Sequence, residues 1–542
     1  MNTQNYEIGG NIIENLTTGM YKDSEIIYRE YIQNACDQID KAIENGLLDK
    51  DEGKIDIFIN PDSRLISIED NATGIPAKDF SKTLGDVANS SKKLGENKGF
   101  RGIGRLAGLA YCDKLVFVSS YAGEDIISRM ECDAVLMRKL LNENVQGKKH
   151  SAIEILQAIY SFSAEKTKKI DEHFFKVELQ GVSSNSSLLL DVDKIKSYLS
   201  FVTPVKYSTK FYHRKTIEKY ANEHNYKLDE YKIRVNGDVI LKNYTMNYKT
   251  RGNGDDAIRD IVFKEFYDDK GDLLAWMWYG ITDFKGAIPD SCEMRGIRVR
   301  TGNIQIGNDL WLENFFNETR GAKYFIGEIF TISSDLIPNS QRDYFNETKS
   351  RIIFEKLISN FVNKELNPIY HKGSDMNGFF KTLEKIEVEE LKLKNKSNKG
   401  ALDKNDAENT KNRLESILEE KKKLEDKISG LGDSKSSSQS DRVIARVASN
   451  RTDEYKKKLS EIKKNHESQS DNKVKGKSGE KNKDKKTPQK DTQKNGYRTD
   501  RLTSLDKKER KLIGRVYVAV KKALENDDLT EKVIKAIEDE LK

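Results

Sequence analysis

The chain has few of the residues that build metal centres and disulfide frameworks. Its 542 residues include only four cysteines and six histidines. The cysteines are widely spaced, no two of them form a Cys-x-x-Cys pair, and the histidines do not cluster with them; they are Cys36, Cys112, Cys132 and Cys292. This spacing argues against a zinc site and against disulfide bonds, and it fits a reducing compartment.

The sequence also lacks long apolar runs. No stretch approaches 18 apolar residues, and the N-terminus has no basic region followed by an apolar core, so we expect neither a membrane span nor a signal peptide. The net charge is only +6, because 94 basic residues stand against 88 acidic ones. That balance is weak evidence for a nucleic-acid partner. We therefore expect a soluble, cytoplasmic protein.

Apolar residues become scarce towards the C-terminus. Charged residues make up 34% of the chain and hydrophobic residues 36%, and the charged excess is concentrated after Lys394. The length alone suggests three or four folding units. We expect most of the folded mass before residue 375 and partial disorder after it.

Residues 24–45 predict a helix with Ser24 as its N-cap, because apolar side chains recur at helical spacing. At about 100° per residue, Glu30, Asn34 and Asp37 fall within a stripe of roughly 60°. One edge of this helix therefore carries a carboxylate, an amide and a second carboxylate. Taken alone, such a stripe is more often a solvated polar face.

Residues 54–76 predict two strands joined by a turn, because isoleucines alternate with polar residues on both sides of an Asn-Pro-Asp-Ser sequence. The second strand runs into Asp70 and, four residues later, Gly74. A carboxylate at the end of a buried strand can accept a hydrogen bond from an exocyclic amine, while the glycine turn lets the backbone approach a ring. An ordinary Asp-Asn turn is the alternative.

A glycine-rich segment follows a polar stretch at residues 76–98 and precedes a further helical sequence. It contains the nucleotide-binding candidates Gly99, Arg101, Gly102, Ile103 and Gly104. Glycines at a helix N-terminus free backbone N–H groups to surround phosphate oxygens. No Gly-Lys-Ser/Thr follows, so this is not a Walker A loop, and alone it is a weak signal.

Together, in this order and spacing, the three motifs resemble the Bergerat nucleotide-binding fold of the GHKL superfamily (gyrase, heat-shock protein 90, histidine kinase, MutL). The resemblance covers about residues 7–130. It implies that Asn34 coordinates a Mg²⁺ ion bridging the ATP phosphates, that Asp70 reads the adenine amino group, and that Glu30 is the general base. An oxygen-ligated Mg²⁺ and a base one helical turn away agree with that chemistry.

The resemblance also adds Asp37 and Gly74 to the nucleotide contacts and places Lys92, with Lys93, on a mobile lid. Two departures stand out. Ala72 replaces the usual first glycine of the adenine motif, and residues 173–179 lack the threonine often found on the late strand. The second departure leaves one adenine contact unassigned.

The middle of the chain predicts a second α/β domain, beginning with a strand pair around Asn236 and Gly237, a strong hairpin signal. It resembles the transducer-like middle domain of the heat-shock-90 and MORC-like members. Residues 334–343 look like the loop by which that domain presents an arginine, here Arg342, to the γ-phosphate. A surface arginine paired with a nearby acid is the alternative. Arg298 and Arg300 alternate with apolar residues and are predicted to form an exposed face.

The C-terminal third predicts a short coiled coil with a 3-then-4 apolar spacing that Lys421 interrupts. A helix packed against its own domain is an equal alternative. The lysine-rich stretch at about 465–500 predicts a solvated tether, and a dedicated nucleic-acid site is the alternative. The last segment predicts a helical hairpin, with a first helix led by Ser504 and a second by Thr530.

These observations predict an α+β protein in five parts. The parts are a Bergerat-fold α/β sandwich ATPase at 1–183, a transducer-like α/β domain at 184–372, a helical or coiled-coil region at 373–432, a charged linker at 433–500 and a helical hairpin at 501–542. The predicted catalytic residues are Glu30 and Arg342, and the predicted cofactors are ATP and Mg²⁺.

Two functions stay open. One is a chaperone-like, ATP-driven clamp on a protein client, favoured by the Arg342 loop and the modest net charge. The other is a MutL- or MORC-like clamp on DNA, with a role in genome or anti-phage defence, favoured by the lysine-rich tether and the coiled coil. A nucleotide-controlled scaffold with little turnover is a third possibility. Residues 1–22 resemble the segment that the superfamily often exchanges between protomers, so we expect a nucleotide-dependent homodimer.

Overall fold

The computed structural model describes most of the chain before residue 475 and part of the last thirty residues. The described residues are 8–17, 19, 23–87, 104–251, 254–398, 404–431, 438–474, 513, 516–517, 520, 524 and 527–540. They divide into two compact units, Met1–Lys464 and Asn465–Lys542. The predicted combination of a sheet-containing N-terminal region and a helical C-terminal region is confirmed.

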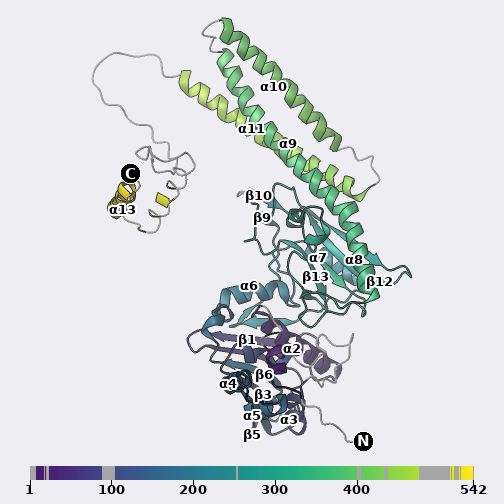
Figure 1. Cartoon of the computed structure of the whole chain (residues 1–542). Helices are drawn as coiled ribbons and strands as arrows, with labels where there is room; N and C mark the ends of the chain where they lie inside the picture. The colour runs from purple at the N-terminus through teal and green to yellow at the C-terminus, as the bar shows by residue number, and fades with distance from the viewer. Residues whose placement is uncertain are drawn as a thin grey trace. The chain divides into compact units, whose positions relative to one another are not determined.

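An eight-stranded sheet forms the N-terminal region (Figure 1), with the strand order β5-β4-β3-β6-β2-β1-β7-β8. The strands are β1 (Lys54–Asn60), β2 (Leu65–Asp70), β3 (Lys114–Ser120), β4 (Ile126–Asp133), β5 (Tyr160–Lys166), β6 (Phe174–Gln180), β7 (Lys232–Val235) and β8 (Asp238–Val239). Neighbouring strands are antiparallel except β1 and β7, which are parallel.

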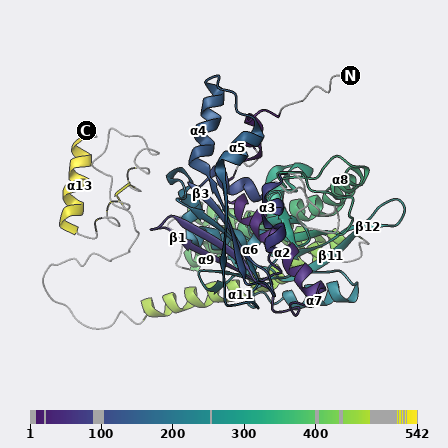
Figure 2. The same cartoon turned by 90° about the horizontal axis from the view of Figure 1, so that it is seen from below.

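Helices cover one face of this sheet. They are α1 (Asn11–Leu16), α2 (Ile26–Glu44), α3 (Ala77–Gly85), η1 (Gly104–Ala110), α4 (Ala134–Val145), α5 (Ala152–Ile159), η2 (Ser184–Leu190) and α6 (Val192–Val202). Figure 2 shows α4 and α5 side by side. Alternate side chains of β1, such as Ile55 and Ile57, are buried against the helices, whereas Phe58 on the opposite face is exposed. This pattern is that of a half-solvated sheet.

The hairpin predicted around Asn236 and Gly237 is confirmed as β7 and β8, and both turn residues have positive φ. It does not open a separate sheet. Because β7 lies parallel to β1, and the side chain of Asn236 bonds to the backbone of Ile59, the hairpin completes the first sheet. The first sheet therefore reaches beyond residue 183, where we predicted the ATP-binding domain to end.

A second, five-stranded sheet follows with the order β11-β12-β15-β13-β14, next to a small β9/β10 pair. Its strands are β9 (Asn247–Lys249), β10 (Asp255–Ala257), β11 (Asp260–Tyr267), β12 (Leu273–Ile281), β13 (Gly296–Thr301), β14 (Ile304–Ile306) and β15 (Ile326–Thr331). Short η3 (Glu313–Phe315) and η4 (Thr319–Tyr324) link β14 to β15. Helix α7 (Arg214–Glu223) packs with Trp276 and Trp278 on one face, and α8 (Lys349–Phe361) packs with Met277 and Tyr279 on the other.

This double covering makes the exposed face predicted for Arg298 and Arg300 wrong. Arg298 is 5% exposed and Arg300 is fully buried. Arg300 donates to Glu328 of β15 at 2.6 Å and to the backbone oxygen of Phe201 at 2.6 Å. Lys242, also fully buried, donates to Glu328 at 3.1 Å. The arginines can be buried because their charges meet a carboxylate and backbone carbonyls.

Long helices follow the second sheet. After α8 and the π-turn η5 (Val362–Leu366) come α9 (Asn367–Asn398), α10 (Lys404–Leu431) and α11 (Gln439–Val474). Helix α10 packs along α9 of the same chain, the alternative that we left open beside a coiled coil. Helix α11 occupies part of the predicted linker; Val443, Ile444 and Val447 give it a buried apolar stripe within an otherwise charged sequence.

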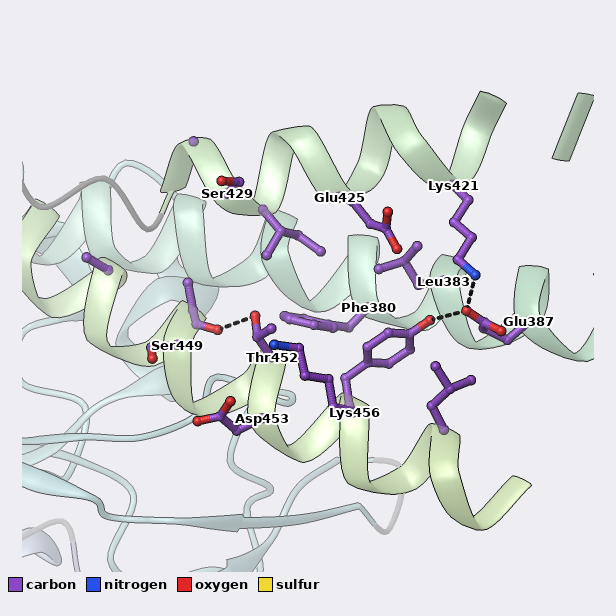
Figure 3. Close-up of a pocket in the computed structure, with 16 residues that line it drawn as sticks. Phe380, Leu383, Glu387, Lys421, Glu425, Ser429, Ser449, Thr452, Asp453 and Lys456 are labelled. Carbon is purple, nitrogen blue, oxygen red and sulfur yellow. Dashed lines mark hydrogen bonds and ion pairs between the residues drawn. The ribbon is translucent and has the colours of Figure 1, made fainter. Parts of the chain in front are cut away.

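Lys421, which interrupts the apolar spacing of α10, meets two acidic residues of α9. It pairs with Glu387 and donates to Glu390 at 3.1 Å, while Tyr455 of α11 donates to Glu387 at 3.1 Å. Lys421, Glu387 and Tyr455 border a cavity of about 840 Å³ between the three helices, and Phe380 is among its other lining residues (Figure 3). A buried polar contact of this kind can fix the register of packed helices.

In the second unit, α13 (Asp527–Glu540) begins three residues before Thr530, the residue predicted to lead the last helix. Ser504 and most of the predicted first helix of the hairpin lie outside the described residues. Within the part of the chain that the structure describes, no helix is long and apolar enough to cross a membrane.

Candidate functional site

Helix α2 presents a buried polar edge. Glu30 is 9% exposed and Asp37 is 2% exposed, and Asn34 is half-buried. The interpretation of this stripe as a solvated face is therefore wrong. The N-cap is Glu25 rather than the predicted Ser24, and no side chain caps the helix. The apolar residues of α2 fix its orientation by packing into the core beneath the first sheet. In this orientation α2 contacts the η1 segment, and Glu30 lies next to Gly104.

Glu30 meets Arg342, which lies far away in sequence and follows the second sheet. The Arg342 Nε and Glu30 Oε1 atoms lie 3.5 Å apart and form an ion pair. The preceding residue, Gln341, accepts a hydrogen bond at 2.9 Å from Arg29, the neighbour of Glu30 on α2. Arg342 is 7% exposed, so the surface-arginine alternative is wrong. The structure thus brings together the two residues that we predicted to be catalytic.

The backbone of Arg342 has a φ of +55°, a left-handed conformation that few non-glycine residues adopt. Its own carbonyl accepts a hydrogen bond from Gly307 at 2.9 Å, which anchors the loop to the second sheet. Such backbone strain persists only where surrounding contacts impose it, and it gathers at functional sites. Arg342 is therefore held at α2 by a specific loop geometry.

Asp70 ends β2 and is 4% exposed. One of its carboxylate oxygens accepts a hydrogen bond at 3.0 Å from the backbone N–H of Ala72, which is itself fully buried. Gly74 has a φ of +67°, and a Cβ there would collide with the backbone oxygen of Ser120. A side chain is therefore excluded at Gly74, and the turn after Asp70 stays narrow.

Strand β6, which pairs with β2, has no residue with a hydroxyl group near Asp70. In the pairing of β2 with β6, Phe175 lies opposite Asp70 and Val177 lies opposite Ile68. This register agrees with the absence of threonine noted in the sequence. Nearby, the side chain of His173 bonds to the backbone oxygen of Ala72 at 2.7 Å.

Gly104 is the only member of the predicted glycine loop among the described residues. Lys92, Gly99, Arg101, Gly102 and Ile103 lie outside them. Gly104 begins η1, and a Cβ there would meet the carboxylate of Glu30. Tyr31 of α2 donates to the backbone oxygen of Arg105 and accepts from the N–H of Gly108, both at 3.0 Å, so η1 is fixed on α2.

Several buried polar atoms on one turn of α2 have no hydrogen-bond partner. They are Arg29 Nε, Glu30 Oε1 and both amide atoms of Gln33. The sequence analysis missed Arg29 and Gln33. The helical spacing was the available signal, since Gln33 lies only about 60° from Glu30 on the helix.

Among the described residues, no three His, Cys, Asp or Glu side chains gather so that they could hold a metal ion. Mg²⁺ commonly keeps several waters and binds through one or two protein oxygens together with substrate phosphates. The amide of Asn34, one turn from Glu30 on α2, fits that mode. Asp70 supplies a buried acceptor for an amino group.

Comparisons with known proteins agree with this geometry. A family model described as histidine kinase-, DNA gyrase B- and HSP90-like ATPase matches residues 24–165. The chaperone protein HtpG of Clostridium perfringens is 31% identical over 140 residues, which are 23% of this chain and 22% of that protein. HtpG of Sulfurovum sp. is 31% identical over 134 residues, covering 21% and 22%. The matched region therefore spans about a fifth of these relatives.

The matched residues contain α2, the turn after β2 and η1, and the contacts among these elements are those described above. Residues 24–165 of this chain are a domain of the histidine kinase-, DNA gyrase B- and HSP90-like ATPase type.

Proposed function

We propose that the chain binds ATP with Mg²⁺ and hydrolyses it as a conformational clamp, acting in the manner of a chaperone on a protein client. The observation that carries this proposal is the ion pair between Glu30 and Arg342. A residue that follows the second sheet reaches the centre of the ATPase-type domain, so the state of the nucleotide can change how the two regions are held together.

Each residue has a role in this proposal. Asn34 holds Mg²⁺, which when bound neutralises phosphate charge. Asp70 accepts a hydrogen bond from the adenine amino group. Glu30 takes a proton from the attacking water. Arg342 leaves its loose ion pair with Glu30 and turns to the γ-phosphate, where it offsets the charge that develops during transfer.

Four variants test the assignment. We expect Asn34→Ala and Asp70→Asn to abolish ATP binding, and Glu30→Ala to bind ATP but lose turnover, because metal and adenine contacts hold the ligand whereas the base acts only in the chemical step. Glu44→Ala, at the exposed end of the same helix, is the matched control. Nucleotide titration and phosphate release measure both properties. Unchanged hydrolysis in Glu30→Ala would remove Glu30 from the role of base.

The clamp also requires a change of association. We propose that ATP closes two chains into a transient dimer, because closure with Arg342 on the γ-phosphate creates contacts that the open state lacks. Sedimentation of Glu30→Ala with ATP, with ADP and without nucleotide tests this. ATP alone should raise the mass, and Arg342→Ala should weaken that response without preventing binding. Equal mass in all three states contradicts the proposal and favours a scaffold.

The partner separates the chaperone-like clamp from a clamp on DNA. The similarity to the chaperone protein HtpG favours a protein client. Capture of bound proteins with Glu30→Ala in ATP tests the first function. Duplex DNA binding that falls steeply with salt concentration would support the second, because neutralised phosphates release counterions.

A further inference from the structure

Gln33 is a buried amide with nothing to bind. Its side chain is 1% exposed, and neither its amide nitrogen nor its amide oxygen has a hydrogen-bond partner. Among the described residues, it is the only one with two such atoms. Buried polar groups are almost always paired, because each unpaired group has lost its water without replacement. An apolar side chain of the same length would avoid this cost. The presence of a buried amide at this position therefore calls for an explanation.

The position of Gln33 supplies that reason. It lies three residues after Glu30 and four after Arg29 on α2, so its side chain neighbours both of theirs on the helix surface. Helical side chains lean towards the N-terminus and cover the preceding turn, which here carries Glu30. Arg29 Nε and Glu30 Oε1 also lack a hydrogen bond, although Glu30 Oε1 forms the ion pair with Arg342. The groups without hydrogen bonds therefore lie on neighbouring positions of α2, on the part of the helix that Arg342 approaches through Glu30.

We propose that Gln33 positions the water that attacks the γ-phosphate. This inference rests on the proposed function. The amide oxygen accepts a hydrogen bond from the water, and the amide nitrogen donates to an oxygen of the γ-phosphoryl group. A glutamine amide has one acceptor and one donor group to offer, and an attacking water beside a phosphoryl oxygen requires both.

The step balances with groups already named. The water oxygen forms a bond to the γ-phosphorus, the bond from that phosphorus to the bridging oxygen breaks, and its electron pair leaves with ADP. Glu30 takes the proton that the water loses. Gln33 gains and loses no proton, so it acts by fixing the direction of attack.

Gln33→Met tests the proposal, because methionine keeps the length of the side chain and removes its hydrogen bonds. We expect ATP affinity within about twofold of wild type, and single-turnover hydrolysis lowered about a hundredfold. We also expect the nucleotide-free protein to melt at the same or a higher temperature, since two unpaired atoms are removed. Gln157→Met, on the exposed side of α5, should change none of the three quantities.

The outcomes separate the possible roles of Gln33. Normal hydrolysis in Gln33→Met with a raised melting temperature would mean that Gln33 is only an unpaired packing residue. A lowered melting temperature with lost ATP binding would mean that it supports the fold. Either result overturns the inference and leaves the proposed function standing. A wild-type chain that binds ATP without hydrolysing it overturns both.

Discussion

Two buried charged sites in this molecule differ in how completely their polar atoms are hydrogen-bonded. On α2, Glu30 faces Arg342 at 3.5 Å and keeps an oxygen without a hydrogen bond. Between the second sheet and the segment after β8, Glu328 accepts from Arg300 at 2.6 Å, from Lys242 at 3.1 Å, from Tyr244 at 3.2 Å and from Tyr207. We call these last residues the Glu328 cluster. None of its side-chain atoms lacks a partner.

This difference indicates that the Glu328 cluster holds the fold together, whereas the α2 site is built to bind a ligand. The Glu328 cluster ties the second sheet to segments around the first, because Arg300 also bonds to the end of α6 and Lys242 follows β8. A saturated network rigidifies such a junction. At the α2 site, several buried polar atoms lack hydrogen bonds. This lowers the stability of the folded chain but leaves these atoms available for a ligand. Burial and charge alone do not distinguish the two sites, whereas hydrogen-bond satisfaction does.

The largest expected effect comes from removing the same residue type at each site. Glu328→Ala leaves Lys242 and Arg300 buried without their carboxylate, and we expect it to lower the free energy of unfolding by about 3–5 kcal/mol. Glu30→Ala should change that free energy by less than about 1 kcal/mol, because Glu30 is poorly satisfied in the empty site. Denaturant titration of both variants measures the contrast. Equal losses would mean that the α2 site is structural too.

A smaller effect should follow from filling the space beside Glu30. In Gly104→Ala the new methyl group would meet the Glu30 carboxylate, the movable end of a flexible side chain. We expect little change in stability and a loss of turnover of about a hundredfold, the usual result of displacing a catalytic group by about 1 Å. Gly123→Ala is a control for the local change, because a Cβ there meets nothing within 4 Å, although its φ of +87° adds backbone strain. Unchanged turnover in Gly104→Ala would show that the carboxylate need not lie where it does.

The α2 site was largely predictable from sequence because its signals are local. The spacing of Glu30, Asn34 and Asp37 follows from one helix, and Asp70 follows from the end of one strand. Arg342 was predictable only through the resemblance of its loop, since its partner Glu30 is more than 300 residues away in sequence. Gln33 was missed because a helical pattern shows where a side chain lies and not whether its amide is paired.

The Glu328 cluster could not be predicted, because its members come from distant segments. Arg298 and Arg300 alternate with apolar residues as in a half-exposed strand, but β13 is covered on both faces and its arginines find buried partners. The same limit applies to β7, which joins the first sheet through parallel pairing with β1. The stripe of α11 was hidden by its charged neighbours. In each case a contact distant in sequence outweighed the local pattern.

A last expected effect concerns the charge of the Glu328 cluster. Its hydrogen bonds are complete, but two cations, Lys242 and Arg300, share one carboxylate. Burial, with the nearby Arg300, lowers the pKa of Lys242 from 10.5 to about 7, although Glu328 and Glu230 act in the opposite direction. A neutral lysine would balance the cluster and could still donate to Asn303, which it reaches at 2.7 Å. The saturated site should therefore depend on pH.

The sign of this dependence follows from proton uptake. Between pH 7 and pH 10.5 the unfolded chain keeps a proton on Lys242 that the folded chain has lost, so unfolding takes up a proton and the free energy of unfolding rises with pH. The slope from this group is at most about 1.4 kcal/mol per pH unit. Lys242→Met cannot titrate and should lack this part of the slope, while Glu328 keeps Arg300 and both tyrosines as partners. Denaturant titrations of wild type and Lys242→Met across this range measure the difference, in which other titrating groups cancel. Parallel curves would mean that Lys242 stays charged in the folded chain, and the cluster would then hold a net positive charge by hydrogen bonding alone.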